Sequence, residues 1–104
     1  MAQVKMKEAE IIDRIAIHTN VAKDVLIRES LTSFLREKRR MILMDRLEIM
    51  SRYGVNSPFE LEKNIKEGII SEHPSWEDLI EVENLEERLE GIEGDLQSLS
   101  NKIE

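Results

Sequence analysis

The chain has 104 residues, no cysteine and a formal net charge of −7, which fits one small domain and excludes disulfides, thiolate metal sites and cysteine nucleophiles. Its longest apolar run, residues 41–44, is far shorter than the roughly 20 residues that a membrane span needs, and the N-terminus lacks the apolar core of a signal peptide. We therefore expect a cytoplasmic protein.

The charge is divided unevenly along the chain. Residues 1–45 carry nine Lys/Arg against seven Asp/Glu, whereas residues 46–104 carry six against fifteen. Because the acidic part would repel a nucleic acid, any DNA binding is confined to the first 45 residues.

A short strand and a short helix are predicted at the N-terminus. Polar and apolar residues alternate over residues 3–7, which is the pattern of a strand with one buried face. Apolar residues at helical spacing then predict a helix over residues 8–19. We expect the helix to be broken at His18-Thr19-Asn20, because Asn either adopts the left-handed backbone of a turn or caps the next helix.

The longest predicted helix starts between residues 21 and 24 and continues to residue 52 or 53, because no Gly or Pro interrupts it before Gly54. Some 28 residues make a rod of roughly 42 Å, longer than a domain of this size. We therefore expect a dimer or a larger homo-oligomer. The apolar positions of this helix are Val25, Leu26, Leu31, Phe34, Leu35, Ile42, Leu43, Leu47 and Met50.

Four cations lie close together on this helix, namely Arg36, Lys38, Arg39 and Arg40. They point around most of the helix, so they fit a phosphate contact or a solvated collar. They also fit packing against the acidic residues 77–95, within the chain or across a dimer.

Two capping patterns predict the remaining helices. Ser57 followed by Pro58 and Glu60 is typical of a helix start, and Gly68 should end that third helix near Glu67. By the same logic, Ser75 is expected to cap a fourth helix that starts at Trp76.

The C-terminal helix carries a regular apolar seam. Its members alternate three and four residues apart, as in a coiled coil: Val82, Leu85, Leu89, Ile92, Leu96, Leu99 and Ile103. Gly91 and Gly94 weaken this helix, so the end beyond Gly91 should fray when no surface covers it. We expect the segment to dock on the chain's own long helix in isolation, and on a basic partner when one is present.

No enzyme motif is found. The two histidines, His18 and His73, lie in no nucleophile, zinc or phosphate-loop pattern. His73 and Glu77 have the spacing of two metal ligands on a helix, but Pro74 separates them, so we expect no metal and no cofactor. The acidic residues after Trp76 are interpreted as a solvated or partner-facing surface.

The strand, short helix, tight turn and following helix resemble the ribbon-helix-helix family, whose chains pair their strands and place the ribbon in the DNA major groove. The resemblance covers about 35 residues. It implies that Gln3, Lys5 and Lys7 face base edges and that the helix start, Asn20 to Lys23, contacts phosphate. It also implies dimerisation through Val4, Met6, Leu31, Phe34 and Leu35. A helical hairpin with a disordered N-terminus remains the alternative, and Asp24 places negative charge where phosphate would bind.

The overall plan is similar to that of prokaryotic antitoxins. The stretches Tyr53-Gly54-Val55, Phe59-Glu60-Leu61 and Trp76-Glu77-Asp78 also resemble small archaeal proteins associated with toxin–antitoxin operons. The resemblance implies a homodimer that represses its own operon and binds a basic toxin, commonly an RNase. The residues expected to bind this partner are Trp76, Val82, Leu85, Leu89, Ile92, Leu96 and Leu99.

The predicted fold is therefore mainly α-helical: a short N-terminal β-strand, a helical hairpin with one long helix, a short third helix and an acidic C-terminal heptad helix. Residues 1–53 form the predicted dimerisation module, and residues 54–104 form the predicted partner-binding segment. The alternative function is a homo-oligomeric helical scaffold or adaptor that binds no nucleic acid.

Overall fold

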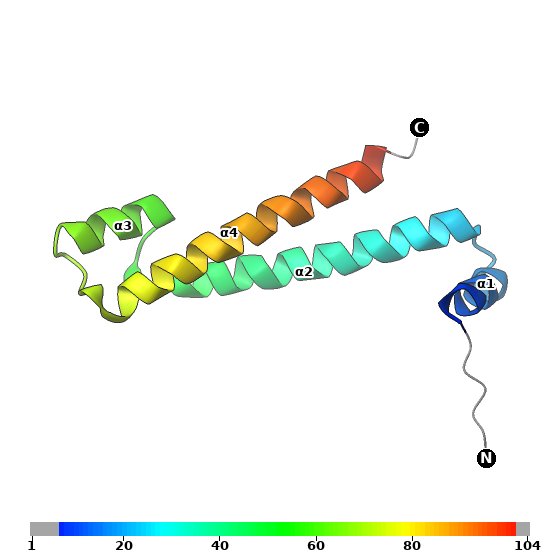
Figure 1. The fold of residues 1–104 in the computed structure, drawn as a ribbon, viewed down its shortest axis with the longest axis horizontal. Coiled ribbons are helices and arrows are strands. Elements are labelled where there is room, and N and C mark those ends of the chain that lie inside the picture. The colour runs from blue at the N-terminus through cyan, green and yellow to red at the C-terminus, as the bar shows by residue number, and fades with distance from the viewer. Residues whose placement is uncertain (1–6, 102–104) are drawn as a thin grey trace, which may run out of the picture. The chain divides into compact units, whose positions relative to one another are not determined.

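A computed structural model describes residues 7–101 of the chain, and this range is entirely helical apart from turns (Figure 1). It contains the helices α1 (Glu8–Thr19), α2 (Lys23–Tyr53), α3 (Pro58–Lys66) and α4 (Glu72–Asn101). The prediction of a mainly helical chain with one long helix is confirmed. The predicted strand lies outside the described residues except for Lys7. Over residues 7–101, no helix has the length and apolar character needed to cross a membrane.

The described residues fall into two compact units that divide within α2, between Phe34 and Leu35. Unit 1 contains α1 and the first part of α2. Unit 2 contains the rest of α2 together with α3 and α4.

In unit 1, the turn between α1 and α2 forms at Asn20, as predicted. Asn20 has left-handed backbone angles, with φ of 57°, and its N–H donates to carbonyls of the last turn of α1. This arrangement is a common way to end a helix, and Asn tolerates it better than most residues. Lys23 at the start of α2 lies 2.9 Å from the Asp13 carboxylate of α1, so an ion pair also links the two helices.

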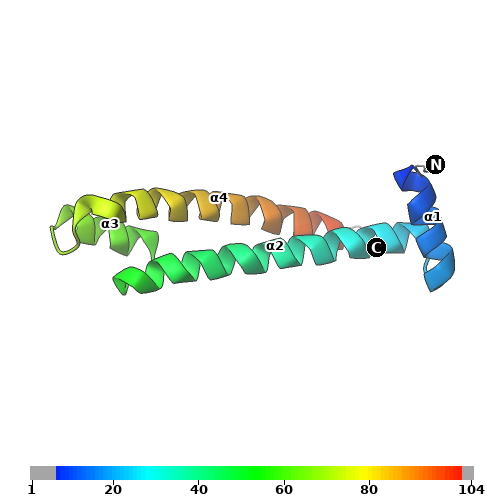
Figure 2. The same cartoon turned by 90° about the horizontal axis from the view of Figure 1, so that it is seen from below.

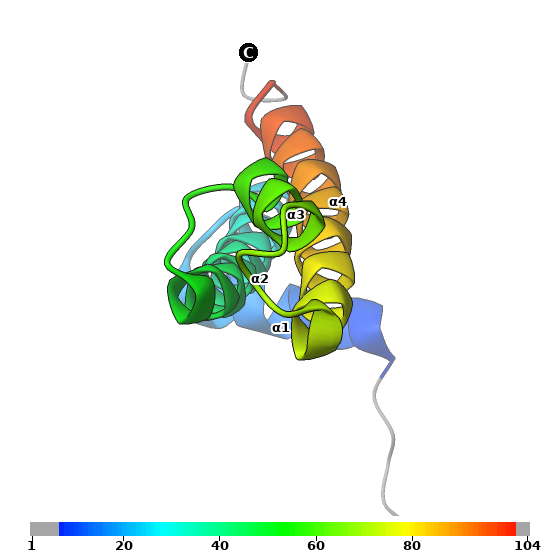
Figure 3. The same cartoon turned by 90° about the vertical axis from the view of Figure 1, so that its left-hand side faces the viewer.

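Unit 2 is a helical hairpin closed by α3, and it holds the apolar core. Figures 2 and 3 show α3 packed at the end of the hairpin where α2 stops and α4 starts. All three helices contribute buried side chains. The core residues are Ile42, Ile49, Met50, Val55, Leu61, Ile65, Leu79, Val82 and Leu85.

The local signals at the start of α3 act as predicted. Gly54 follows α2 with φ of 63°, which suits glycine because it has no Cβ. The Ser57 hydroxyl accepts a hydrogen bond of 3.0 Å from the Glu60 N–H, and Pro58 occupies the first helical position. The Glu60 carboxylate in turn accepts from the Asn56 N–H at 3.0 Å. The chain entry into α3 is thereby fixed from both sides.

The predicted cap at Ser75 is wrong. Helix α4 begins at Glu72, but it is interrupted at His73. The backbone of His73 is extended, with φ of −122° and ψ of 130°. Ser75 therefore lies inside the first regular turn. It is fully buried, and its hydroxyl donates to the Ser71 carbonyl instead of accepting from a helix N–H.

Candidate interaction surfaces

The first four residues of the apolar seam of α4 pack in the core that α4 shares with α2 and α3. Val82 and Leu85 are fully buried, and Leu89 and Ile92 pack against the core. Leu96 and Leu99 are half-buried, and Ile103 lies outside the described residues. The prediction that the seam packs against the long helix is confirmed for the seam residues that lie in or against the core.

Two ion pairs connect α2 and α4 and show their antiparallel register. Arg52 lies 3.2 Å from Asp78, and Arg46 lies 3.7 Å from Glu86. These pairs use acidic residues of the 77–95 stretch within the chain, but their α2 cations lie outside the four-cation group, for which such pairing was one of three interpretations.

Tyr53 completes a polar contact at the closed end of the hairpin. Its hydroxyl donates to the Asp78 carboxylate, which also accepts from Arg52. Burial, the hydrogen bond to Asp78 and the negative charge of that carboxylate together raise the pKa of Tyr53 to about 12. This contact joins the last turn of α2 to the first turns of α4.

Trp76 does not lie with the seam. It is 42% exposed, and Ile80, one helical turn later, is 46% exposed. Residues four apart share a helix face, so the two form an apolar outer face of α4. The sequence interpretation grouped Trp76 with the seam and missed both Ile80 on the outer face and Leu79 in the core.

A second exposed face lies on α2. Leu43 and Leu47 were predicted as apolar helix positions, but they are 42% and 65% exposed, while Ile42, Ile49 and Met50 face the core. One turn before them, the Arg40 guanidinium holds Glu37 at 2.6 Å. Hydrogen bonding to Arg40 lowers the pKa of the Glu37 carboxyl.

The described part of unit 1 contains no buried side chain. Of the residues predicted for dimerisation, Leu31 is 48% exposed and Phe34 is 59% exposed. Leu35 is half-buried and belongs to unit 2. Val4 and Met6 lie outside the described residues.

Of the residues predicted to bind DNA, Lys7, Asn20 and Lys23 lie within the part of the chain that the structure describes. Gln3 and Lys5 lie outside the described residues, and Lys7 is exposed before α1. Asn20 ends α1, and the Lys23 ammonium is held by Asp13. Negative charge therefore lies beside the cation expected to meet phosphate.

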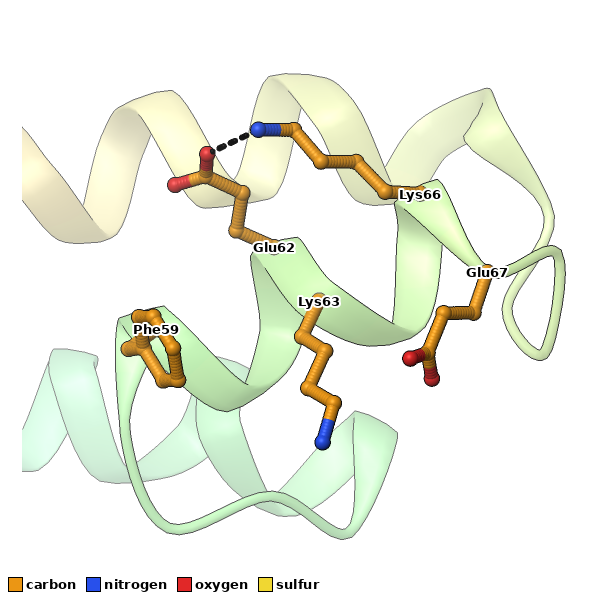
Figure 4. A pocket seen from close by; sticks show the side chains of 5 residues that line it. All are labelled: Phe59, Glu62, Lys63, Lys66 and Glu67. Carbon is orange, nitrogen blue, oxygen red and sulfur yellow. Dashed lines mark ion pairs between the residues drawn. The ribbon is translucent and has the colours of Figure 1, made fainter.

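Two shallow hollows lie on and beside α3. One, on α3 itself, is lined by Phe59, Glu62, Lys63, Lys66 and Glu67, and Lys66 pairs with Glu62 at 2.8 Å (Figure 4). The other is lined by Ile65, Lys66, Glu72, His73 and Trp76. His73 lies 3.0 Å from Glu77. Among residues 7–101, no group of three metal-ligating side chains is found.

These surfaces define a small helical protein with a hairpin core and exposed apolar faces on several helices. The family described as "Uncharacterized protein MJ0235 family" matches residues 1–104, so the chain belongs to this family. No curated protein and no solved structure matches the chain.

Proposed function

We propose that this chain is a homodimeric, antitoxin-like protein. Unit 1 pairs with unit 1 of a second copy, and the C-terminal end of α4 binds a basic partner protein. The proposal combines the resemblance to antitoxins with two features of the described residues: the uncovered apolar side chains of unit 1 and the acidic, half-covered end of α4.

The observation that carries the dimer is the absence of buried side chains between residues 7 and 34. Helix α1 has 12 residues, and isolated helices of this length are marginal in water. Its Ile11 and Ile15 are both 42% exposed, and Leu31 of α2 is 48% exposed. Full burial of such a side chain is worth roughly 1.5–3 kcal/mol. A second copy would supply the burial that unit 1 lacks.

Replacing Leu31 with Glu should abolish association through unit 1 and lower the mass at micromolar concentration, because a carboxylate would be desolvated at the centre of the interface. The mass should be measured by light scattering at micromolar concentration. Ile17 is the matched control: it is 76% exposed and lies on the opposite face of α1 from Ile11 and Ile15. Ile17→Glu should leave the mass unchanged. A monomeric mass for the unmodified chain would contradict the proposed dimer.

The partner surface is assigned to the last turns of α4, where Leu96 and Leu99 are only half-buried. The sequence from residue 89 to 101 contains Glu90, Glu93 and Asp95 and no cation. An acidic helix of this kind suits a basic protein surface and would compete with RNA for the active site of an RNase. Val82 and Leu85 would support this surface from the core.

Replacing Leu96 with Glu should abolish partner binding and leave the unit 1 dimer intact. The partner should be identified by mass spectrometry of proteins that copurify with the chain, and its binding measured by calorimetry. Gln97→Glu, at an exposed neighbouring position, adds the same charge off the seam and should bind normally. Amides beyond Gly91 should exchange fast in the free chain and slowly in the complex. Slow exchange in both states, with normal binding by Leu96→Glu, would refute the partner surface.

A homo-oligomeric scaffold without nucleic-acid binding is the second candidate. The ion pair between Lys23 and Asp13 and the nearby Asp24 favour it over a DNA-binding repressor, because phosphate would have to compete with two carboxylates. Titration of the chain with its own upstream DNA at several salt concentrations distinguishes the two. Affinity that falls steeply with salt and is lost in Lys5→Ala/Lys7→Ala would support the repressor.

A further inference from the structure

Two exposed helix faces of unit 2 have complementary orders of charged and apolar residues when one helix is read forwards and the other backwards. Along α2, the first face contains two cations followed by two aliphatic residues: Arg36, Arg40, Leu43 and Leu47. Read from its C-terminal side, α4 presents two acids followed by two apolar residues: Glu87, Glu83, Ile80 and Trp76. Successive members are four, three and four residues apart in both sets. All eight residues are exposed.

We propose that these faces pair between two copies of the chain, with α2 of one copy antiparallel to α4 of the other. Leu47 then lies against Trp76 of the second copy, and Leu43 lies against its Ile80. In the next two layers, Arg40 meets Glu83 and Arg36 meets Glu87. Alternation of four- and three-residue steps is the spacing of a helix seam, so all four layers form in one register. This pairing does not depend on the unit 1 dimer.

The α2 face is free of core residues only up to Leu47, because Met50, three residues further along the same face, is buried. At about 100° per residue, the exposed set on α2 is roughly a third of a turn from the stripe formed by Ile42 and Ile49. The set on α4 is displaced similarly from Val82 and Leu89. A helix can therefore dock on either face while the hairpin stays closed.

The charges favour a second copy over other arrangements of these faces. Within residues 7–101, Glu83 and Glu87 form no ion pair, and neither does Arg36. Arg40 is paired with Glu37, but that pair is exposed and such pairs stabilise little, so Arg40 can change partner at low cost. Pairing of α4 with α4 would place acid against acid.

The register allows two copies to form only one of the two possible contacts between α2 of one copy and α4 of the other. Within the chain, the pairs Arg46–Glu86 and Arg52–Asp78 place Leu47 level with residues near position 84. Against the second copy, Leu47 is level with Trp76, an offset of about eight residues or roughly 12 Å. Two copies therefore cannot form both contacts about one twofold axis. A pair of copies therefore keeps one unpaired α2 face at one end and one unpaired α4 face at the other. Further copies can add to these faces, so the assemblies grow with concentration.

Two charge-reversed variants of the full chain test the pairing in sedimentation velocity. Arg36→Glu/Arg40→Glu makes both faces acidic, and Glu83→Arg/Glu87→Arg makes both basic. Compared with the unmodified chain, each variant alone should need a concentration at least about tenfold higher to form assemblies larger than the unit 1 dimer. An equimolar mixture should recover growth, because each face then meets its complement. Glu81→Arg/Asp95→Arg changes charge to the same extent away from the face and should behave as the unmodified chain.

Growth that is unchanged in both variants, or that does not return on mixing, would overturn the pairing. A mass that does not change with concentration in the unmodified chain would do the same. The Leu31→Glu variant distinguishes a failure of this pairing from a failure of the proposed unit 1 dimer. That variant should lose the unit 1 contact and still show growth that the charge reversals abolish.

Discussion

Replacing Leu61 with Ala should lower the free energy of unfolding by about 3–4 kcal/mol. Leu61 has no exposed surface and lies in the core formed by α2, α3 and α4. Its truncation removes apolar burial and leaves a cavity, which together cost roughly 2–5 kcal/mol. A small domain has a total stability of about 5–15 kcal/mol, so this loss is a large fraction. It should be measured by urea denaturation followed by circular dichroism, at one protein concentration.

Phe59 provides the control on the same helix. It is larger than Leu61, but it is 76% exposed, so Phe59→Ala should change the stability by no more than about 0.5 kcal/mol. Equal effects of the two substitutions would show that α3 packs through a different face.

Above pH about 10, the chain should lose stability through Tyr53. The pKa of Tyr53 is raised from 10 to about 12 in the folded protein, so the folded state holds the phenol proton more tightly than the unfolded state. The resulting stabilisation is complete below pH about 10 and is lost as the pH rises through about 12. Because Tyr53 is only partly buried, solvent screening limits this loss to about 1 kcal/mol.

Comparison with Tyr53→Phe isolates this contribution from the titration of lysines in the same range. The variant should be about 1 kcal/mol less stable at neutral pH, because it lacks the hydrogen bond to Asp78. Its stability should then fall less between pH about 10 and about 12. Parallel curves for the two proteins would rule out the proposed effect of Asp78 and burial on Tyr53.

The helix boundaries were predictable where a residue acts on its own backbone. Asn20 and Gly54 adopt left-handed angles, and Ser57 accepts from a helix N–H three residues on. These effects are local, so the sequence pattern contains them. The prediction of a cap at Ser75 rested on the same logic and was wrong, because the extended backbone at His73 places Ser75 inside the helix, where its hydroxyl donates a hydrogen bond to the Ser71 carbonyl.

The assignment of helix faces was less predictable, because it depends on packing between distant segments. The seam from Val82 onwards could be found by its period, but its partner surface, the stripe of Ile42 and Ile49, could not be distinguished from Leu43 and Leu47 on the same helix. All four are aliphatic residues within two turns. Only the fold of α4 and α3 onto one side of α2 decides which are buried.

Trp76 also gives the protein an internal optical probe. It is the only tryptophan, it is 42% exposed, and it lies on the outer face of α4. Excitation at the red edge of the absorption band selects tryptophan over tyrosine. Its emission should therefore shift to the blue when a helix covers this face, because emission from a solvent-exposed indole is red-shifted relative to that from a buried one. Dimerisation through unit 1 alone should leave the emission unchanged, so one spectrum distinguishes the two association events in unlabelled protein.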